Sequence, residues 1–330
     1  MLKVPLIGMS DAILKTNKGR FSRRHFLAAG SVGVAGLWAG FSNQMPARAV
    51  RNLVIESSRN ILRPKYTPTP GNWDPNAITA AWLGHSTVLI NFYGLSILTD
   101  PVLGRRVGAD TFLGTIGAKR LVAPALKAGQ LPKIDLVLLS HAHMDHLDPA
   151  SLRALSGSPK SVTAHDTTDL LTDTPLKNPV ALRWGEKTVV GTDKGDVEIE
   201  AFEVKHWGAR WKVDTYRGYN GYVISREGKK IIFGGDTAYT ESFRALRGRG
   251  PYELAIMPIG AYEPWVCSHC TPEQALRMAN DAGARQLLPV HFKTFAFGRE
   301  GIVEPMRRLR KVIEPERLAL SDVGQTVRIS

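Results

Sequence analysis

The chain has 330 residues, of which 43% are hydrophobic and 22% are charged, and this balance excludes a disordered or fibrous protein. The formal net charge is +13, and residues 1–49 hold seven basic residues against one acid. A positive excess suits anionic substrates or an anionic membrane surface, and it equally fits a charge that serves only solubility. Because the basic residues form no dense run with interleaved aromatic residues, we expect no nucleic-acid partner. Only two cysteines are present, Cys267 and Cys270, which excludes a disulfide framework.

The first 49 residues have the features of a twin-arginine export signal. Ser22-Arg23-Arg24-His25-Phe26-Leu27 follows a basic stretch, and an apolar, glycine-rich run then extends from Phe26 to Phe41. Pro46-Ala47-Arg48-Ala49 places small residues where cleavage after Ala49 needs them. The apolar run is short for a membrane span, which needs about 20 residues. We therefore expect a signal peptide over residues 1–49 and a mature protein that is periplasmic or secreted.

The rest of the chain is expected to hold a proline-rich lead-in segment over residues 50–76 and one folded domain over residues 77–330. Short apolar runs between turn residues predict strands at 77–82, 87–93, 95–98, 134–139, 197–202, 222–225, 230–233, 254–257 and 286–290. Helices are expected at 149–155, 240–247, 272–282 and 303–313, the third with a capping threonine followed by proline. Paired strands followed by alternating strands and helices favour a layered α/β domain.

A dense group of metal-binding side chains follows the apolar run at 134–139. It reads Ser140-His141-Ala142-His143-Met144-Asp145-His146-Leu147-Asp148. His141 and His143 are two residues apart, so on extended backbone both point to the same side and reach one metal. After the chain turns, Asp145 and His146 are placed to face a second metal. Imidazole and carboxylate groups at this density are typical of a zinc site.

Further candidate ligands lie elsewhere in the chain, each just after a predicted strand. They are His206 after the strand at 197–202, Asp236 after the strand at 230–233, and His291 after the strand at 286–290. Loops at one edge of a sheet converge on a common site, so we expect these three side chains to join the first group. A carboxylate such as Asp236 is able to bridge two metals through its two oxygens.

This pattern resembles that of the metallo-β-lactamase superfamily and, within it, the N-acylphosphatidylethanolamine-hydrolysing phospholipase D group. The shared segments include Trp82-Leu83-Gly84-His85, the loop at 141–148, Gly235-Asp236-Thr237 and Gly260-Ala261-Tyr262-Glu263-Pro264. The resemblance implies a four-layer αβ/βα fold. It further implies that one zinc is held by His141, His143 and His206, that the other is held by Asp145, His146 and His291, and that Asp236 bridges both. His269 matches a further active-site histidine of that group.

The resemblance implies a binuclear metal-dependent hydrolase, with zinc preferred and manganese as an alternative. A metal-bridging hydroxide is expected to attack a small-molecule or lipid phosphodiester, and a membrane surface is a further expected contact. Asp145 is expected to orient the hydroxide and accept its proton, and His269 to stabilise charge or protonate the leaving group. His85, Asp100 and Asp148 are candidates for supporting the ligands. Tyr262, with Trp207, Trp211 and Trp265, is a candidate for lining an apolar pocket.

Three other functions remain open on the sequence. A lactonase or other carbonyl-ester hydrolase uses the same chemistry, so the ligand pattern does not separate it from a phosphodiesterase. A true β-lactamase is disfavoured by Asp236, because those enzymes lack this ligand. A non-catalytic, metal-holding exported protein is disfavoured by the complete ligand set. The state of Cys267 and Cys270 is also open between a tight disulfide and two small apolar fillers.

Overall fold

The computed structural model describes residues 59–111 and 114–329, and the expected signal peptide lies outside these residues. Within them, two mixed β-sheets carry the core. The first has seven strands in the order β15 (Thr326–Ile329), β1 (Ile78–Gly84), β2 (Thr87–Phe92), β3 (Leu95–Thr99), β6 (Leu136–Leu139), β7 (Lys160–Ala164) and β8 (Lys177–Leu182). The second has six, in the order β14 (Ala284–Val290), β13 (Tyr252–Pro258), β12 (Lys229–Phe233), β11 (Gly221–Arg226), β10 (Gly195–Phe202) and β9 (Lys187–Thr192).

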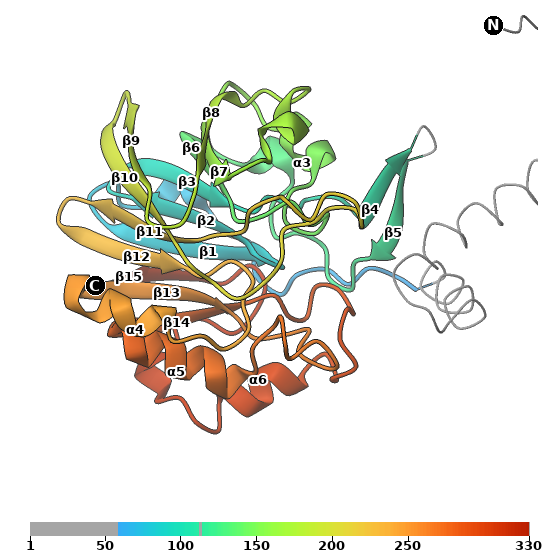
Figure 1. Ribbon diagram of the computed structural model, residues 1–330, viewed down its shortest axis with the longest axis vertical. Coiled ribbons are helices and arrows are strands. Elements are labelled where there is room, and N and C mark those ends of the chain that lie inside the picture. The colour runs from blue at the N-terminus through green and yellow to red at the C-terminus, as the bar shows by residue number, and fades with distance from the viewer. Residues whose placement is uncertain (1–58, 112–113, 330) are drawn as a thin grey trace, which may run out of the picture. The chain divides into compact units, whose positions relative to one another are not determined.

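Helices lie outside the sheets, as Figure 1 shows. They are α3 (Pro149–Arg153), α4 (Ser242–Leu246), α5 (Pro272–Ala282) and α6 (Glu304–Leu309). Helices α4, α5 and α6 cover the outer face of the second sheet, and α3 lies beside the first (Figure 1). Short 3-10 turns occupy Pro70–Asn72, Ala128–Gln130, Thr168–Leu171, Arg247–Arg249 and Pro315–Arg317. The layered α/β architecture expected from the sequence is therefore confirmed.

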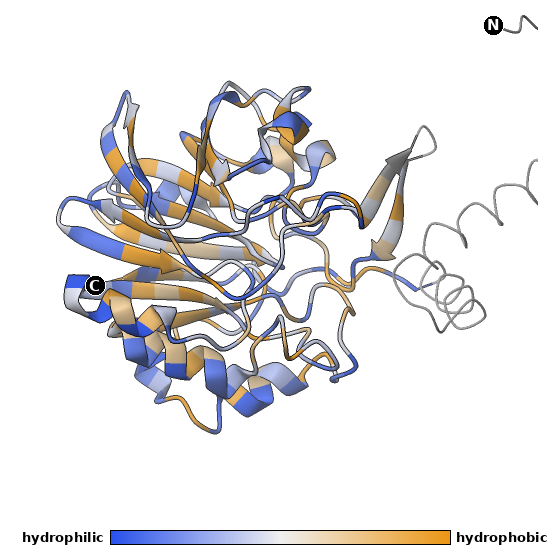
Figure 2. Ribbon diagram, in the orientation of Figure 1, coloured by the Kyte–Doolittle hydropathy of each residue, from blue (hydrophilic) through white to orange (hydrophobic). Residues whose placement is uncertain are grey.

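The hydrophobic core is continuous between the sheets. All residues of β1, β2, β6 and β13 are buried, which explains why these strands are mostly apolar and lack a regular alternation of apolar and polar residues. Figure 2 shows the same distribution, with hydrophobic residues along the central strands and hydrophilic residues on the outer surfaces of the helices. Parallel pairing joins β3, β6, β7 and β8 in one sheet and β12, β13 and β14 in the other. The carboxyl ends of these strands consequently gather their loops at one edge.

Turn and cap residues behave as their chemistry predicts. Glu227 and Gly228 both have positive φ, at 50° and 69°, which is the backbone of a two-residue hairpin turn between β11 and β12. Helix α5 begins where expected, because the Thr271 side chain accepts a hydrogen bond from Gln274 N and the Gln274 side chain accepts one from Thr271 N. It ends at Gly283, which adopts the left-handed conformation at φ 80°.

Several strands were not predicted from the sequence. These are β7, β8, β9, β15 and a two-stranded ribbon of β4 (Arg106–Thr111) and β5 (Gly114–Lys119), which lies apart from the sheets in Figure 1. Helices α4 and α6 are also shorter than the expected segments 240–247 and 303–313. The boundaries of the signal peptide, lead-in segment and folded domain stay predictions. Among the described residues, no helix has both the length and the apolarity that a membrane crossing requires.

Candidate metal centre

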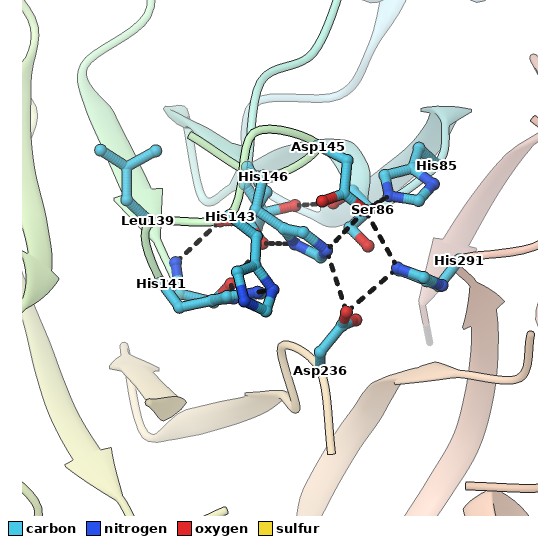
Figure 3. Close-up of polar contacts among 12 residues, drawn as sticks. His85, Ser86, Leu139, His141, His143, Asp145, His146, Asp236 and His291 are labelled. Atoms are coloured by element: carbon cyan, nitrogen blue, oxygen red, sulfur yellow. Dashed lines mark hydrogen bonds and ion pairs between the residues drawn. The ribbon is translucent and has the colours of Figure 1, made fainter. Parts of the chain in front are cut away.

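The candidate ligands come from loops that follow strands of both sheets. Figure 3 shows six of them pointing toward one another, namely His141, His143, Asp145, His146, Asp236 and His291. His85 follows β1, and the loop at 141–148 follows β6. His206, Asp236 and His291 follow β10, β12 and β14. The predicted position after strand ends is therefore found, and residues more than 200 positions apart in the sequence share one cluster.

A first group consists of three imidazoles. His141 Nε2 lies 2.8 Å from His143 Nδ1, and His206 Nε2 lies 3.2 Å from the same atom. Two nitrogens that bind one tetrahedral zinc at about 2.0–2.1 Å are themselves about 3.3 Å apart. The spacing of the three nitrogens thus suits a single divalent ion.

A second group combines two imidazoles with two carboxylates. Asp236 Oδ2 lies 3.1 Å from His146 Nε2 and 3.0 Å from His291 Nε2. Asp145 Oδ2 lies 3.5 Å from His146 Nε2 and 3.4 Å from His291 Nε2. All four distances are close to the spacing of neighbouring atoms around one tetrahedral ion.

Asp236 lies between the two groups. Its Oδ2 is also 3.8 Å from His206 Nε2, and its side chain is 1% exposed. Asp236 Oδ1, His146 Nε2 and His291 Nε2 are buried without a hydrogen bond of acceptable geometry. Buried polar atoms without partners are costly, so a converging set of them fits a bound cation. The residues present therefore fit two metal ions, with Asp236 adjacent to both.

Hydrogen bonds behind the cluster fix the orientation of several ligands. The Asp100 carboxylate is fully buried and accepts hydrogen bonds from Ser140 N at 2.7 Å and from Ser140 Oγ at 2.5 Å. It also lies 2.6 Å from His146 Nδ1, and Ser140 Oγ lies 2.9 Å from His141 Nδ1. With a proton on Nδ1, His141 and His146 both turn Nε2 toward the cluster.

Two more contacts reach the ligands from the other side. His206 Nδ1 donates to the Ser268 carbonyl oxygen at 2.8 Å, which leaves His206 Nε2 as the ligand atom. His85 Nε2 lies 2.8 Å from Asp145 Oδ2. His85 was expected only to support the ligands, and the structure places it in direct contact with Asp145, within the same group of ligand atoms as His146 and His291.

Burial sets the charge of the first group. It lowers the pKa of His143 to about 4 and moves the pKa of His141 and His206 well below the ordinary histidine value. These three imidazoles are consequently neutral at pH 7 and offer lone pairs to a cation.

In the second group carboxylates face imidazoles. Burial lowers the pKa of His146 and His291, but the facing carboxylates outweigh it, raising the pKa of His291 to about 9 and that of His146 well above the ordinary histidine value. Burial alone raises the pKa of Asp236, but the facing imidazoles of His146 and His291 outweigh it and hold this pKa well below its usual range. For Asp145, burial is likewise outweighed, here by His146, His291 and His85. Both carboxylates therefore carry negative charge at neutral pH, which suits a divalent ion.

The remaining candidate residues divide between the cluster and the scaffold. His269 Nδ1 lies 3.8 Å from Asp236 Oδ2 and has no hydrogen bond, so this residue faces the centre. Asp148 instead caps α3, accepting from Ser151 N and Ser151 Oγ. The Tyr262 hydroxyl donates to Glu304 at 3.0 Å, which ties it to α6. Cys267 and Cys270 are free thiols, the first exposed and the second buried.

Two residues that the sequence did not single out also hold the site. Arg210 is buried, and its Nη1 donates to the carbonyl oxygens of Ala142 at 3.0 Å and Leu147 at 2.7 Å, so one guanidinium spans the ligand loop. Ser140 joins Asp100 to His141, as described above. The sequence around Arg210 does not indicate this role, because an arginine near Trp207, Trp211 and Lys212 is expected to be a surface residue.

The sequence of the chain is similar to those of known proteins. A family model described as a beta-lactamase superfamily domain matches residues 96–292. The chain is 29% identical over 256 residues to N-acyl-phosphatidylethanolamine-hydrolyzing phospholipase D 1 of Caenorhabditis elegans, and the aligned region covers 72% of this chain and 70% of that protein. It is 31% identical over 261 residues to the mitochondrial N-acyl-phosphatidylethanolamine-hydrolyzing phospholipase D of Saccharomyces cerevisiae, and the aligned region covers 74% of this chain and 54% of that protein.

A solved structure shows the same fold. Igni18, described as a novel metallo hydrolase from the hyperthermophilic archaeon Ignicoccus hospitalis, superposes with a TM-score of 0.57 at 20% identity. The match covers 77% of this chain and 99% of that chain. This likeness confirms the fold class expected from the sequence.

Proposed function

We propose a reaction for this chain, which belongs to the beta-lactamase superfamily, has its four-layer αβ/βα fold and is a metal-dependent hydrolase. The reaction is hydrolysis of a phosphodiester in the manner of a phospholipase D. N-acylphosphatidylethanolamine or a related lipid phosphodiester is the proposed substrate, and two zinc ions are the proposed cofactor. The observation that carries the proposal is the position of Asp236, whose carboxylate meets both groups of ligand atoms.

The proposed metal ligands are the seven side chains of the two groups. His141, His143 and His206 hold one ion, Asp145, His146 and His291 hold the other, and Asp236 contacts both. When bound, two divalent ions lower the pKa of a water from 15.7 to about 7 and neutralise charge on a phosphodiester. Imidazole and carboxylate ligands also accept manganese, which is the alternative ion.

Asp145 is the proposed general base. Its side chain is 18% exposed, whereas that of Asp236 is 1% exposed, so solvent and substrate reach Asp145. Burial lowers the pKa of His85 to about 3, so this imidazole is neutral and donates from Nε2 to Asp145 Oδ2. That contact fixes the carboxylate, which would take the proton of the attacking water.

His269 is the proposed partner of the substrate's phosphoryl group. Burial lowers the pKa of His269 to about 4, so the ring is neutral at pH 7 and serves as a hydrogen-bond donor. A neutral donor aimed at the phosphoryl oxygens stabilises charge that grows during cleavage. The second proposed role of the ring is to protonate the departing alkoxide.

An apolar surface adjoins this centre. The Trp207 ring packs 4.6 Å from the ring of His143 and is 38% exposed. Trp211 and Trp265 are exposed as well. Such a surface suits the hydrocarbon part of a lipid phosphodiester and contact with a membrane surface. The names of the Caenorhabditis and Saccharomyces relatives support the same substrate class.

Export by the twin-arginine route, with cleavage after Ala49 and a periplasmic or secreted product, completes the proposal. The route carries folded proteins, which suits a protein that acquires its metals before export. Cell fractionation tests this part. Replacing both Arg23 and Arg24 by lysine is expected to retain the protein in the cytosol, and an uncleaved wild-type protein in the cytosol contradicts export.

The substrate proposal is tested with purified mature protein on three substrates. They are bis-p-nitrophenyl phosphate, vesicles containing N-acylphosphatidylethanolamine, and a simple lactone. We expect hydrolysis of both phosphodiesters, and release of an N-acylethanolamine from the lipid.

Asp145→Asn is expected to reduce turnover roughly 10²–10⁴-fold, the usual contribution of a general base. Asp166→Asn, which changes a half-exposed carboxylate outside the ligand groups, serves as the matched control and is expected to leave turnover unchanged. Turnover of the lactone, with no turnover of either phosphodiester, contradicts a phosphodiesterase and supports a carbonyl-ester hydrolase instead.

A further inference from the structure

In the segment Cys267-Ser268-His269-Cys270, the two inner residues contact the metal centre. The Ser268 carbonyl oxygen accepts the hydrogen bond of His206 Nδ1 at 2.8 Å. The next residue, His269, places its Nδ1 3.8 Å from Asp236 Oδ2. Two cysteines therefore flank the pair of residues through which this loop reaches the ligands.

The two thiols face opposite surroundings. Cys267 is exposed, whereas Cys270 is 1% exposed and its thiol donates to the Pro258 carbonyl oxygen at 3.2 Å. The backbone between them is held in a turn, because Ser268 N and His269 N both donate to the Trp265 carbonyl oxygen, at 2.8 and 2.9 Å. Cysteines three residues apart are close along the chain, but an exposed thiol and a buried thiol are bridged only if the backbone moves.

We propose that Cys267 and Cys270 form a thiol–disulfide exchange site whose oxidation withdraws Ser268 and His269 from the metal centre. The reactant is a small-molecule disulfide such as oxidised glutathione. The consequence for metal binding rests on the proposed role of His206 as a ligand, whereas formation of the disulfide does not.

The exchange occurs in two balanced steps. The exposed Cys267 thiolate attacks one sulfur of the small disulfide, so a mixed disulfide forms and one small thiolate leaves. The Cys270 thiol then loses its hydrogen bond to Pro258, gives its proton to solvent and attacks the Cys267 sulfur. The second small thiolate leaves, the protein pair is oxidised by two electrons, and the reagent is reduced to two thiols.

Closure of this short ring displaces the residues inside it. Ser268 then no longer accepts from His206 Nδ1, and the imidazole loses the partner that fixes its orientation. Loss of such a partner typically weakens metal binding 10–100-fold. His269 moves with the same turn, so turnover falls together with metal affinity, and reduction of the disulfide restores both.

The test uses the full mature protein loaded with zinc. After incubation with oxidised glutathione, intact-mass measurement is expected to show a loss of two hydrogens, and thiol titration a loss of both free thiols. Competition with a chromogenic zinc chelator is expected to show 10–100-fold weaker binding of one ion. Dithiothreitol is expected to restore the affinity.

Cys267→Ser is the matched control, because this exposed position tolerates the change. The variant is expected to keep wild-type zinc affinity before and after oxidant. Failure of the internal disulfide to form, or a disulfide that leaves zinc affinity unchanged, overturns the proposal while the reduced protein still holds two ions. A reduced protein that binds no zinc overturns both this proposal and the proposed metal centre.

Discussion

Replacing Asp100 by asparagine is expected to weaken the metal centre from behind, without removing any ligand. Three donors converge on the two Asp100 oxygens, namely Ser140 N–H, Ser140 Oγ–H and His146 Nδ1–H. An asparagine side chain offers only one acceptor oxygen, so at least one donor faces an NH₂ group. Because the site is fully buried, no solvent replaces the lost contact.

The expected size of the effect follows from this loss. Removing a hydrogen-bond partner of a metal-binding histidine typically costs 10–100-fold in affinity, or about 1.4–2.8 kcal/mol. An unsatisfied buried donor costs about 1–3 kcal/mol of folding free energy in addition. Asp100→Asn is therefore expected to bind the ion held by His146 10–100-fold more weakly and to melt at a lower temperature.

Zinc affinity is measured by competition with a chelator, and the fold is checked by circular dichroism. Asp148→Asn is the matched control, because Asp148 is also buried but accepts from Ser151 and caps α3. Asparagine caps helices nearly as well as aspartate, so zinc affinity is expected to stay within about threefold. A folded Asp100→Asn protein with wild-type affinity, or an equal loss in Asp148→Asn, refutes the reasoning.

Three further changes test other parts of the structure. Gly235→Ala is expected to abolish zinc binding. Gly235 has φ 57°, and a Cβ there would lie 2.8 Å from Asn220 O and from Ser140 Cβ, so the turn would shift and displace Asp236. A variant that still binds zinc counts against the role of this turn. Arg210→Met is expected to destabilise the protein by about 1–3 kcal/mol in denaturant titrations and to weaken zinc binding, since it removes two donations to the ligand loop; an unchanged midpoint contradicts this. Glu273→Gln is expected to lower the melting temperature by roughly 1–3 °C at pH 7, as befits a partly exposed ion pair with Arg308. Burial raises the pKa of Glu273, but the Arg308 hydrogen bonds outweigh it and hold the pKa below the ordinary value of 4.5. The folded pKa is thus the lower one, so the pair stabilises above pH 4.5 and its contribution is lost as the pH falls; a difference between the proteins that persists in acid contradicts this assignment.

The central strands and the ligand loop were predictable because their signals are local. The four residues of β6, Leu136–Leu139, form a continuous apolar run, and the three histidines that follow it lie within six residues of one another. His206, Asp236 and His291 were predicted to lie near the ligand loop from their positions after strand ends alone. This was possible because the carboxyl ends of these strands lie at one edge of the two sheets.

Contacts between distant residues carry no such signal. The pairing of Asp100 with His146 and of Ser268 with His206 spans 46 and 62 residues, and nothing near Asp148 distinguishes it from Asp100 before folding. Three of the missed strands lack a signal for other reasons. β8 and β9 are mostly exposed, so they lack an apolar pattern, and β15 is recognised only through its pairing with β1 at the other end of the domain.

The central claim is that two metal ions lie between these loops, with Asp236 next to both. Diffraction from crystals grown with zinc, recorded on either side of the zinc absorption edge, tests it directly. We expect two anomalous peaks, one among His141, His143 and His206 and one among Asp145, His146 and His291, with Asp236 in contact with each. A single peak, or two peaks of which neither touches Asp236, contradicts it.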